Sequence, residues 1–332
     1  MRTFHLWGNN GEPNFISPES VALYWILKDS KYGITKENAI TRDEIVFSNN
    51  TDLSPDNHLP LLIIINDEKE EPIKVSGFDN IIRYYQRVEP TTVNPDNSNQ
   101  LYENSLLEYV MNDMNPLTMY QLYLNSANYV GFTRKQFSQL LYFPMWYNVP
   151  INYRTNVRKQ CDTNLNLEYS LIEDDPDFDT LGKESDDDST KATDLTQSKT
   201  FKLKAKSLLK NKNEFHEMKH NLQYLKKMTD VIKQWFVVRY ETLPQDQEIA
   251  ADILLLANIY IQISLPQGDK VLEALQKELG EEKMKAITKM LDELKGKSIT
   301  IDKRSPVFNE QGNIIMSIYH RGCSYIWDKS AT

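Results

Sequence analysis

The chain has 332 residues, of which 40% are hydrophobic and 26% are charged, and its formal net charge is −9. These proportions predict a soluble globular protein of about two domains with a real core. The acidic balance argues against a general nucleic-acid binder, which needs a basic excess. The two cysteines, Cys161 and Cys323, form no CxxC pair, which favours a reducing compartment and argues against structural zinc.

The first part of the chain alternates strand-like and helix-like patterns. Residues 4–7 form a short apolar strand, and the turn 8–11 follows. Ser17, Pro18 and Glu19 then begin a helix, with Ser as N-cap, Pro at the first helical position and Glu favourable to the helix dipole. Residues 44–47 form a second strand. This order predicts a β-α-β unit.

A second pair of strands and a helix complete this domain. The isoleucine-rich run 61–65 predicts a buried central strand, and residues 72–75 predict its hairpin partner. Ser76 and Asp79 resemble a capping box that opens a helix over 78–86. The whole order, β-α-β-β-α, is that of the thioredoxin-like fold. By analogy with that fold, which has a cis-proline before its third strand, we predict a cis Leu59–Pro60 bond.

The remaining chain has helical periodicity, and its last clear helices are predicted over 269–295 and 311–326. The predicted boundaries are a thioredoxin-like domain over 1–90, a linker over 91–103, and a helical domain over 104–172 and 201–332, interrupted by an insert over 173–200. The apolar run Ile249–Leu265 contains Asp252, Asn258 and Gln262. These polar residues indicate a buried core helix and not a membrane span.

The insert 173–200 contains ten acidic residues and few apolar ones, so we expect it to be disordered. A lysine-rich run over 199–212 follows directly. It could meet an acidic receptor tail or anionic lipid headgroups, at about 1 kcal/mol per lysine near a charged surface. The alternative is a solvated helix face that pairs with the acidic insert.

No pattern indicates catalysis, a metal or a cofactor. The sequence has no GxSxG elbow, P-loop, GxGxxG or HExxH. His216 and His220 have the i, i+4 spacing of a metal pair, but their lysine-rich surroundings favour a solvated face. We therefore expect no catalytic, cofactor-binding or metal residues.

Candidate partner-binding residues come from three segments. The aromatic cluster 142–147 has the composition of either an interface or a core. We favour core, with Trp146 and Tyr147 as its most exposed members. Residues near the C-terminus could pack on the domain or on a partner. The candidates are Tyr142, Phe143, Trp146, Tyr147, Lys199, Lys202, Lys204, Lys206, Ile318 and Tyr325.

Several segments resemble known families. Residues 251–257, ADILLLA, resemble the buried core helix of the glutathione transferase C-terminal domain. The layout of a thioredoxin-like domain before an all-helical one is also that of glutathione transferases, an α+β to mostly α fold. Longer segments, among them 45–54, LLYFPMWYNVP at 140–150 and 251–268, resemble the metaxin family. Within it they are similar to the fungal, budding-yeast-type subunits of the sorting and assembly machinery (SAM complex) of mitochondria.

The resemblance implies a role in β-barrel biogenesis on the cytosolic face of the mitochondrial outer membrane. The implied partners are the membrane-embedded β-barrel assembly subunit, a second metaxin-like subunit, the central receptor of the TOM translocase, and β-barrel precursors. The implied role is to aid precursor release and to couple the complex to TOM. Animal metaxins can carry a C-terminal membrane anchor, whereas residues 326–332 here do not form one. We therefore expect peripheral membrane association through partners.

The same resemblance allows an enzyme alternative to be tested. Glutathione transferases use Tyr, Ser or Cys after the first strand to stabilise the thiolate, and here that turn is Gly8–Gly11. They also hold the γ-glutamyl group at the start of the third helix, where this chain has Gly77 and Phe78. Both departures argue against a glutathione-transferase-like enzyme. The third alternative is a soluble adaptor that binds precursors.

Overall fold

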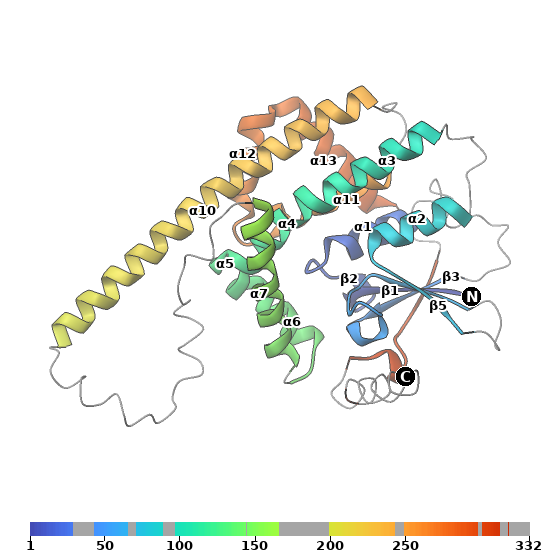
Figure 1. Ribbon diagram of the computed structural model, residues 1–332, viewed down its shortest axis with the longest axis horizontal. Helices are drawn as coiled ribbons and strands as arrows, with labels where there is room; N and C mark the ends of the chain where they lie inside the picture. Colours follow the sequence, from blue (N-terminus) through green and yellow to red (C-terminus); the bar gives the residue numbers. More distant parts are fainter. Residues whose placement is uncertain are drawn as a thin grey trace.

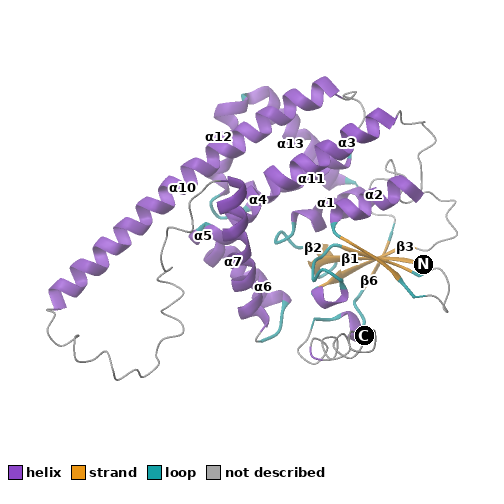
Figure 2. Ribbon diagram, viewed as in Figure 1, coloured by secondary structure: helices purple, strands orange, loops and turns teal. Residues whose placement is uncertain are grey.

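The computed structural model describes residues 1–28, 43–65, 71–88, 97–143, 145–165, 199–242, 249–297, 301–312 and 318. A mixed sheet with two flanking helices forms one side of the molecule, and a larger helical assembly forms the other (Figures 1 and 2). The structure therefore confirms the expected fold class, an N-terminal mixed α+β unit followed by a mainly helical region.

The sheet is built around a central strand, β1 (Arg2–Asn9). It pairs in parallel with β3 (Asp43–Ser48) and antiparallel with β4 (Leu61–Ile64), so that Phe4 lies opposite both Ile45 and Leu62. The remaining strands are β2 (Glu12–Pro13), β5 (Ile73–Ser76) and β6 (Asp302–Arg304). The order across the sheet is β5-β4-β1-β3-β6, with β2 paired to β1. All residues of β1 except Asn9 are buried, as expected for a strand covered on both faces.

Helices α1 (Pro18–Lys28) and α2 (Phe78–Val88) pack with this sheet. The hydroxyl oxygen of Ser17 accepts the Ser20 N–H at 3.2 Å, which confirms the predicted N-cap. The Leu59–Pro60 bond is cis, also as predicted. The prediction of a capping box at Ser76 is wrong by one residue. The helix begins at Phe78 after Gly77 (φ +87°), and the Ser76 hydroxyl instead accepts a hydrogen bond from Ser54.

The helical part begins earlier than predicted. Helix α3 starts at Asn97, inside the expected linker, because the Asn and Ser residues that suggested a loop also begin helices. Short π-helical segments at 110–114, 120–124 and 129–133 join the next helices. The helices are α3 (Asn97–Tyr109), α4 (Asn115–Met119), α5 (Ser126–Asn128), α6 (Arg134–Leu140), α7 (Met145–Leu165), α10 (Lys199–Thr242), α11 (Ala250–Ser264), α12 (Gly268–Leu279) and α13 (Glu281–Gly296).

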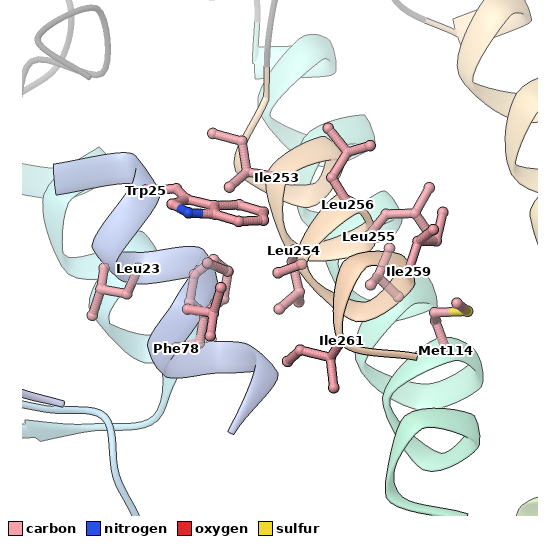
Figure 3. Close-up of a cluster of buried hydrophobic side chains, with 14 of the residues drawn as sticks. Leu23, Trp25, Phe78, Met114, Ile253, Leu254, Leu255, Leu256, Ile259 and Ile261 are labelled. Carbon is pink, nitrogen blue, oxygen red and sulfur yellow. The ribbon is translucent and has the colours of Figure 1, made fainter. Parts of the chain in front are cut away.

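Helix α11 is the centre of the core and joins the two parts. It packs against α1, and Figure 3 shows the side chain of Ile253 beside the ring of Trp25. Of the polar residues that predicted a core helix, Asn258 and Gln262 are buried and hydrogen-bonded, and the partly buried Asp252 pairs with Arg239. Asn258 donates to Asn115 at 2.8 Å, and Gln262 donates to Thr118 at 2.6 Å. Buried polar side chains are tolerated when they are paired in this way.

Two expectations about the C-terminal part are wrong. It is not all-helical, because β6 leaves it and adds to the edge of the N-terminal sheet beside β3. The expected single helix over 269–295 is two helices, since Gly280 adopts φ +83° between α12 and α13. Most of the expected last helix, 311–326, and residues 173–198 of the acidic insert lie outside the described residues. Within the described part of the chain, no helix combines the length and apolarity that crossing a membrane requires.

Candidate functional site at the domain junction

The corner beside the cis-proline corresponds to the place where glutathione transferases hold the γ-glutamyl group. Phe78, the first residue of α2, is fully buried and belongs to the central hydrophobic cluster (Figure 3). Its side chain therefore fills the position at which a polar anchor would be needed.

A carboxylate of the protein itself occupies the same corner. Glu19 on α1 is buried; Asn115 donates to its Oε1 at 3.1 Å, and His58 Nδ1 lies 3.8 Å from its Oε2. Burial raises the pKa of Glu19, against smaller opposing effects of His58, the Phe78 N–H and Asn115. The N-terminus of α2 thus already has a carboxyl partner within the protein, and a ligand carboxylate would have to displace it.

A cleft of about 530 Å³ lies between the end of β1, the end of α6 and the C-terminal segment. Its lining is mostly polar. It consists of Gly8, Asn9, Asn10, Gly11, Phe47, Asn49, Ser138, Gln139, Leu140, Leu141, Tyr142, Lys303, Arg304, Ser305, Pro306 and Gln311.

The β1–β2 turn forms one wall because its backbone approaches its neighbours closely. A Cβ at Gly8 would lie 2.3 Å from Phe47 Cδ1 and 2.4 Å from the Glu12 carbonyl oxygen, so glycine is required there. Asn10 and Gly11 adopt φ values of 54° and 81°, in the left-handed region that a tight turn uses.

The opposite wall is the segment Ile301–Gly312, here named the C-terminal strap. Arg304 donates to Glu44 on β3 at 2.9 Å and to both carboxylate oxygens of Glu310 at 2.8 Å. Ser48 donates to the Glu310 carbonyl at 3.0 Å, and Asn49 accepts the Gly312 N–H at 2.7 Å. The strap is therefore held along the whole end of β3.

The charged side chains of Lys303, Arg304 and Glu310 in the strap are paired with oppositely charged groups of the protein. Hydrogen bonding to Glu310 holds the pKa of Arg304 above its ordinary value. Burial favours a higher pKa for Glu310, but hydrogen bonds from Arg304 and the Val307 N–H outweigh it and lower that pKa. Lys303 donates to the Gly11 carbonyl at 2.9 Å and pairs with Glu12 at 3.0 Å. Both cations beside the cleft thus already have protein partners.

His5 lies beneath the strap on β1. It is 1% exposed, and its Nε2 lies 4.0 Å from Glu310 Oε1. Burial lowers the pKa of His5 from 6.5 to about 4, with help from Arg304 and Lys74 and against the effect of Glu310. The imidazole is therefore neutral at pH 7, and its contact with Glu310 is not an ion pair there.

The lining of the cleft does not place a nucleophile beside a histidine or carboxylate base. Its described residues include two serines, Ser138 and Ser305, but no cysteine, histidine or carboxylate, and Lys303 among them is paired with Glu12. Cys161 is buried in the helical domain, away from this lining. Across the described residues no group of three His, Cys, Asp or Glu could hold a metal ion. The arrangement is suited to contacting a polar chain segment.

The aromatic candidates are exposed in a different order from the prediction. Phe143 and Tyr142 are 70% and 60% exposed, and Tyr142 lies at the cleft rim. Tyr147 is 37% exposed, and Trp146 is partly buried against the core. The segment leaves α6 before Met145 starts α7, so its first aromatics point away from the helices and the later ones pack on them.

The other sequence candidates divide between described and undescribed residues. Ile318 is exposed, whereas Tyr325 lies outside the described residues. Lys199, Lys202, Lys204 and Lys206 belong to α10, but their side chains lie outside the described part. His220 is buried, so the pair with His216 is not the solvated face that was expected.

The sequence predicted Glu19 only as a residue at the start of a helix, and it gave no indication of a role for Arg304 or Glu310. Arg304 meets Glu44 across 260 residues of chain, and Glu19 meets Asn115 across 96. No local pattern reports such pairs.

Comparison with protein families gives two matches that cover most of the chain. A model described as an outer mitochondrial membrane transport complex protein, Tom37, matches residues 20–154. A model described as the Tom37 C-terminal domain matches residues 173–325. No curated protein matches the sequence significantly.

Proposed function

The chain belongs to the Tom37 family of outer mitochondrial membrane transport complex proteins, and on that premise we propose that it is a non-catalytic accessory subunit of the β-barrel assembly complex. In this role it lies on the cytosolic face of the membrane, aids release of β-barrel precursors and couples the complex to TOM.

One observation carries the non-catalytic part of the proposal. The corner that would hold glutathione is filled by Phe78 and is occupied by the carboxyl group of Glu19. A protein that kept a glutathione-transferase-like fold for catalysis would need this corner open and polar. Closing it leaves the fold as a scaffold whose surfaces are available to partners.

The exposed surface supports a scaffold. Tyr142 and Phe143 form an aromatic pair beside a polar cleft, the combination of apolar anchor and polar rim that protein interfaces use. We assign this pair, Trp146, Tyr147 and Ile318, with Tyr325 and the lysines 199–206, to partner binding. The partners are the membrane-embedded β-barrel subunit, a second metaxin-like subunit and the central receptor of TOM. Membrane association is peripheral and depends on these partners.

The test is a tagged pull-down from mitochondria solubilised in mild detergent, followed by mass spectrometry. Recovery of a β-barrel assembly protein and a second metaxin-like chain supports the proposal. A Phe143→Asp variant, exposed and outside the core, should lose one partner, whereas Met290→Asp on α13 should not. Recovery of unassembled precursors alone would indicate the soluble adaptor, and turnover of glutathione by the purified chain would indicate the enzyme.

A further inference from the structure

Helix α10 (Lys199–Thr242) is only partly covered by the rest of the molecule. Its C-terminal half contributes Tyr224, Met228, Ile232 and Trp235 to the core, each at most 2% exposed. Its N-terminal part projects beyond the other helices (Figure 1).

Where α10 leaves the body, its polarity is inverted. The side that faces the body is polar. Glu217 accepts the N–H and hydroxyl of Ser126 at 3.2 and 2.6 Å, and Asn221 accepts the Tyr120 hydroxyl at 2.8 Å. The side that faces outward is apolar, with Phe215, Met218 and Leu222 exposed at 67%, 61% and 68%. A solvated helix has the opposite arrangement.

These three residues form one seam. They are spaced i, i+3, i+7, which at 100° per residue confines them to about 60° of the helix circumference. That is narrower than the stripe of at least about 100° with which a helix covers a core, and it matches the seam of a two-helix coiled coil. In the sequence the seven-residue spacing from Phe215 continues back through Leu208 to Phe201.

The charges along one side of the seam, at the e positions, have one sign, whereas Glu214 occupies a g position on the other side. In the heptad that places Phe215 and Leu222 at the a position, Lys219 and Lys226 occupy e, and both are exposed. Residues at e and g set the choice of partner in coiled coils through their charge. A row of lysines selects a partner helix with acidic residues at the facing positions.

We propose that the seam formed by Phe215, Met218 and Leu222, with Lys219 and Lys226 beside it, docks an acidic amphipathic helix of a partner protein. A second copy of this chain in antiparallel orientation is a poorer occupant, because it would set lysines at e against lysines. A membrane is also poorer, because a narrow seam buries little apolar area in a lipid surface.

The test uses a fluorescent synthetic peptide of about four heptads, with Leu and Ile at a and d and Glu at every e and g. The glutamates repel one another and keep the peptide monomeric. The full-length protein should bind this peptide at least about tenfold more tightly than the same peptide with Lys at e and g, as measured by fluorescence anisotropy. Leu222→Glu should weaken binding about tenfold or more, and Lys219→Glu with Lys226→Glu should reverse the preference between the peptides.

Two matched controls are available. Met290→Glu places the same charge on an exposed apolar position of α13. Lys270→Glu with Lys277→Glu reverses two exposed lysines with the same spacing on α12. Both should leave binding unchanged. Melting curves of all variants should match the parent, because every substituted residue is exposed.

Five outcomes would overturn the proposal. Equal binding of both peptides, or binding indifferent to Leu222, would show that the seam is not the site. Binding of phosphatidylcholine–phosphatidylserine vesicles that depends on Leu222, without peptide binding, would make the occupant a membrane. A dimer abolished by Leu222→Glu would make it a second copy. Peptide binding seen only after deletion of residues 173–194 would make it the chain's own acidic segment.

Discussion

Arg304 donates to both carboxylate oxygens of Glu310, six residues later in the chain, at 2.8 Å each. The same guanidinium reaches Glu44 on β3 at 2.9 Å, so one side chain closes the C-terminal strap on itself and fixes it to the sheet. A planar fork of donors is needed for this double role, which a lysine could not fill.

Arg304→Ala should therefore destabilise the protein by about 3 kcal/mol, because it removes the guanidinium that pairs with both Glu44 and Glu310. Urea denaturation would measure the change. Lys303→Ala is the matched control on the neighbouring residue. Its partner Glu12 is 65% exposed, so the loss should stay below about 1 kcal/mol. Equal losses for the two variants would show that Arg304 does not anchor the strap.

The contribution of His5 to stability should fall as the pH falls from 6.5 to about 4, whereas the raised pKa of Glu19 acts in the opposite direction. The pKa of His5 is lowered from 6.5 to about 4 in the folded protein, so in this window the unfolded chain binds a proton that the folded chain does not. Unfolding then becomes more favourable by up to about 1.4 kcal/mol per pH unit. The lowered pKa of Glu310 acts in the same direction at more acidic pH.

His5→Leu should flatten this dependence between pH 6.5 and 4, as followed by chemical denaturation at a series of pH values. His216→Gln, at a partly exposed position on α10, should keep it. An unchanged slope in His5→Leu would mean that another group takes up the proton.

Phe78→Ala should cost about 3–5 kcal/mol, because a fully buried aromatic ring is removed from the junction of α1, α2 and α11. Phe143→Ala, which truncates a ring that is 70% exposed, should change stability by no more than about 0.5 kcal/mol. Neither variant should bind glutathione in calorimetry, since Glu19 still occupies the corner. Binding by Phe78→Ala would show that the ring alone had closed the site.

Deletion of residues 173–194 should leave the melting temperature unchanged and affect partner docking at most. The segment has ten acidic residues between 173 and 200 and too few apolar ones to contribute a core. Differential scanning calorimetry of the deletion and the parent would decide, and a large drop in melting temperature would contradict the expectation.

The parts of the fold that local chemistry determines could be predicted from the sequence. The cap at Ser17, the cis bond at Pro60 and the buried α11 with its polar residues all follow from short-range patterns or fold analogy. Of the candidate site, the sequence could predict only that Phe78 stands where glutathione transferases have a polar anchor, because this follows from the residue type alone.

The rest depended on contacts between distant segments. Strand β6, Asp302–Arg304, has no apolar alternation and is a strand only because it pairs with β3. The greater exposure of Tyr142 than of Trp146 depends on where the chain turns between α6 and α7. The inverted face of α10 could not be recognised until Ser126 and Tyr120 identified which side meets the body.

Strand β6 also has a consequence for how the protein is made. Because synthesis proceeds from the N-terminus, β1, β3 and β4 are complete long before residues 302–304 exist, and the outer edge of β3 has no partner strand during that time. The sheet is finished only when the helical domain has been made and has brought the strap back to it. A nascent chain stopped before Asp302 would therefore expose an unpaired strand edge, and it would be the form most in need of a chaperone.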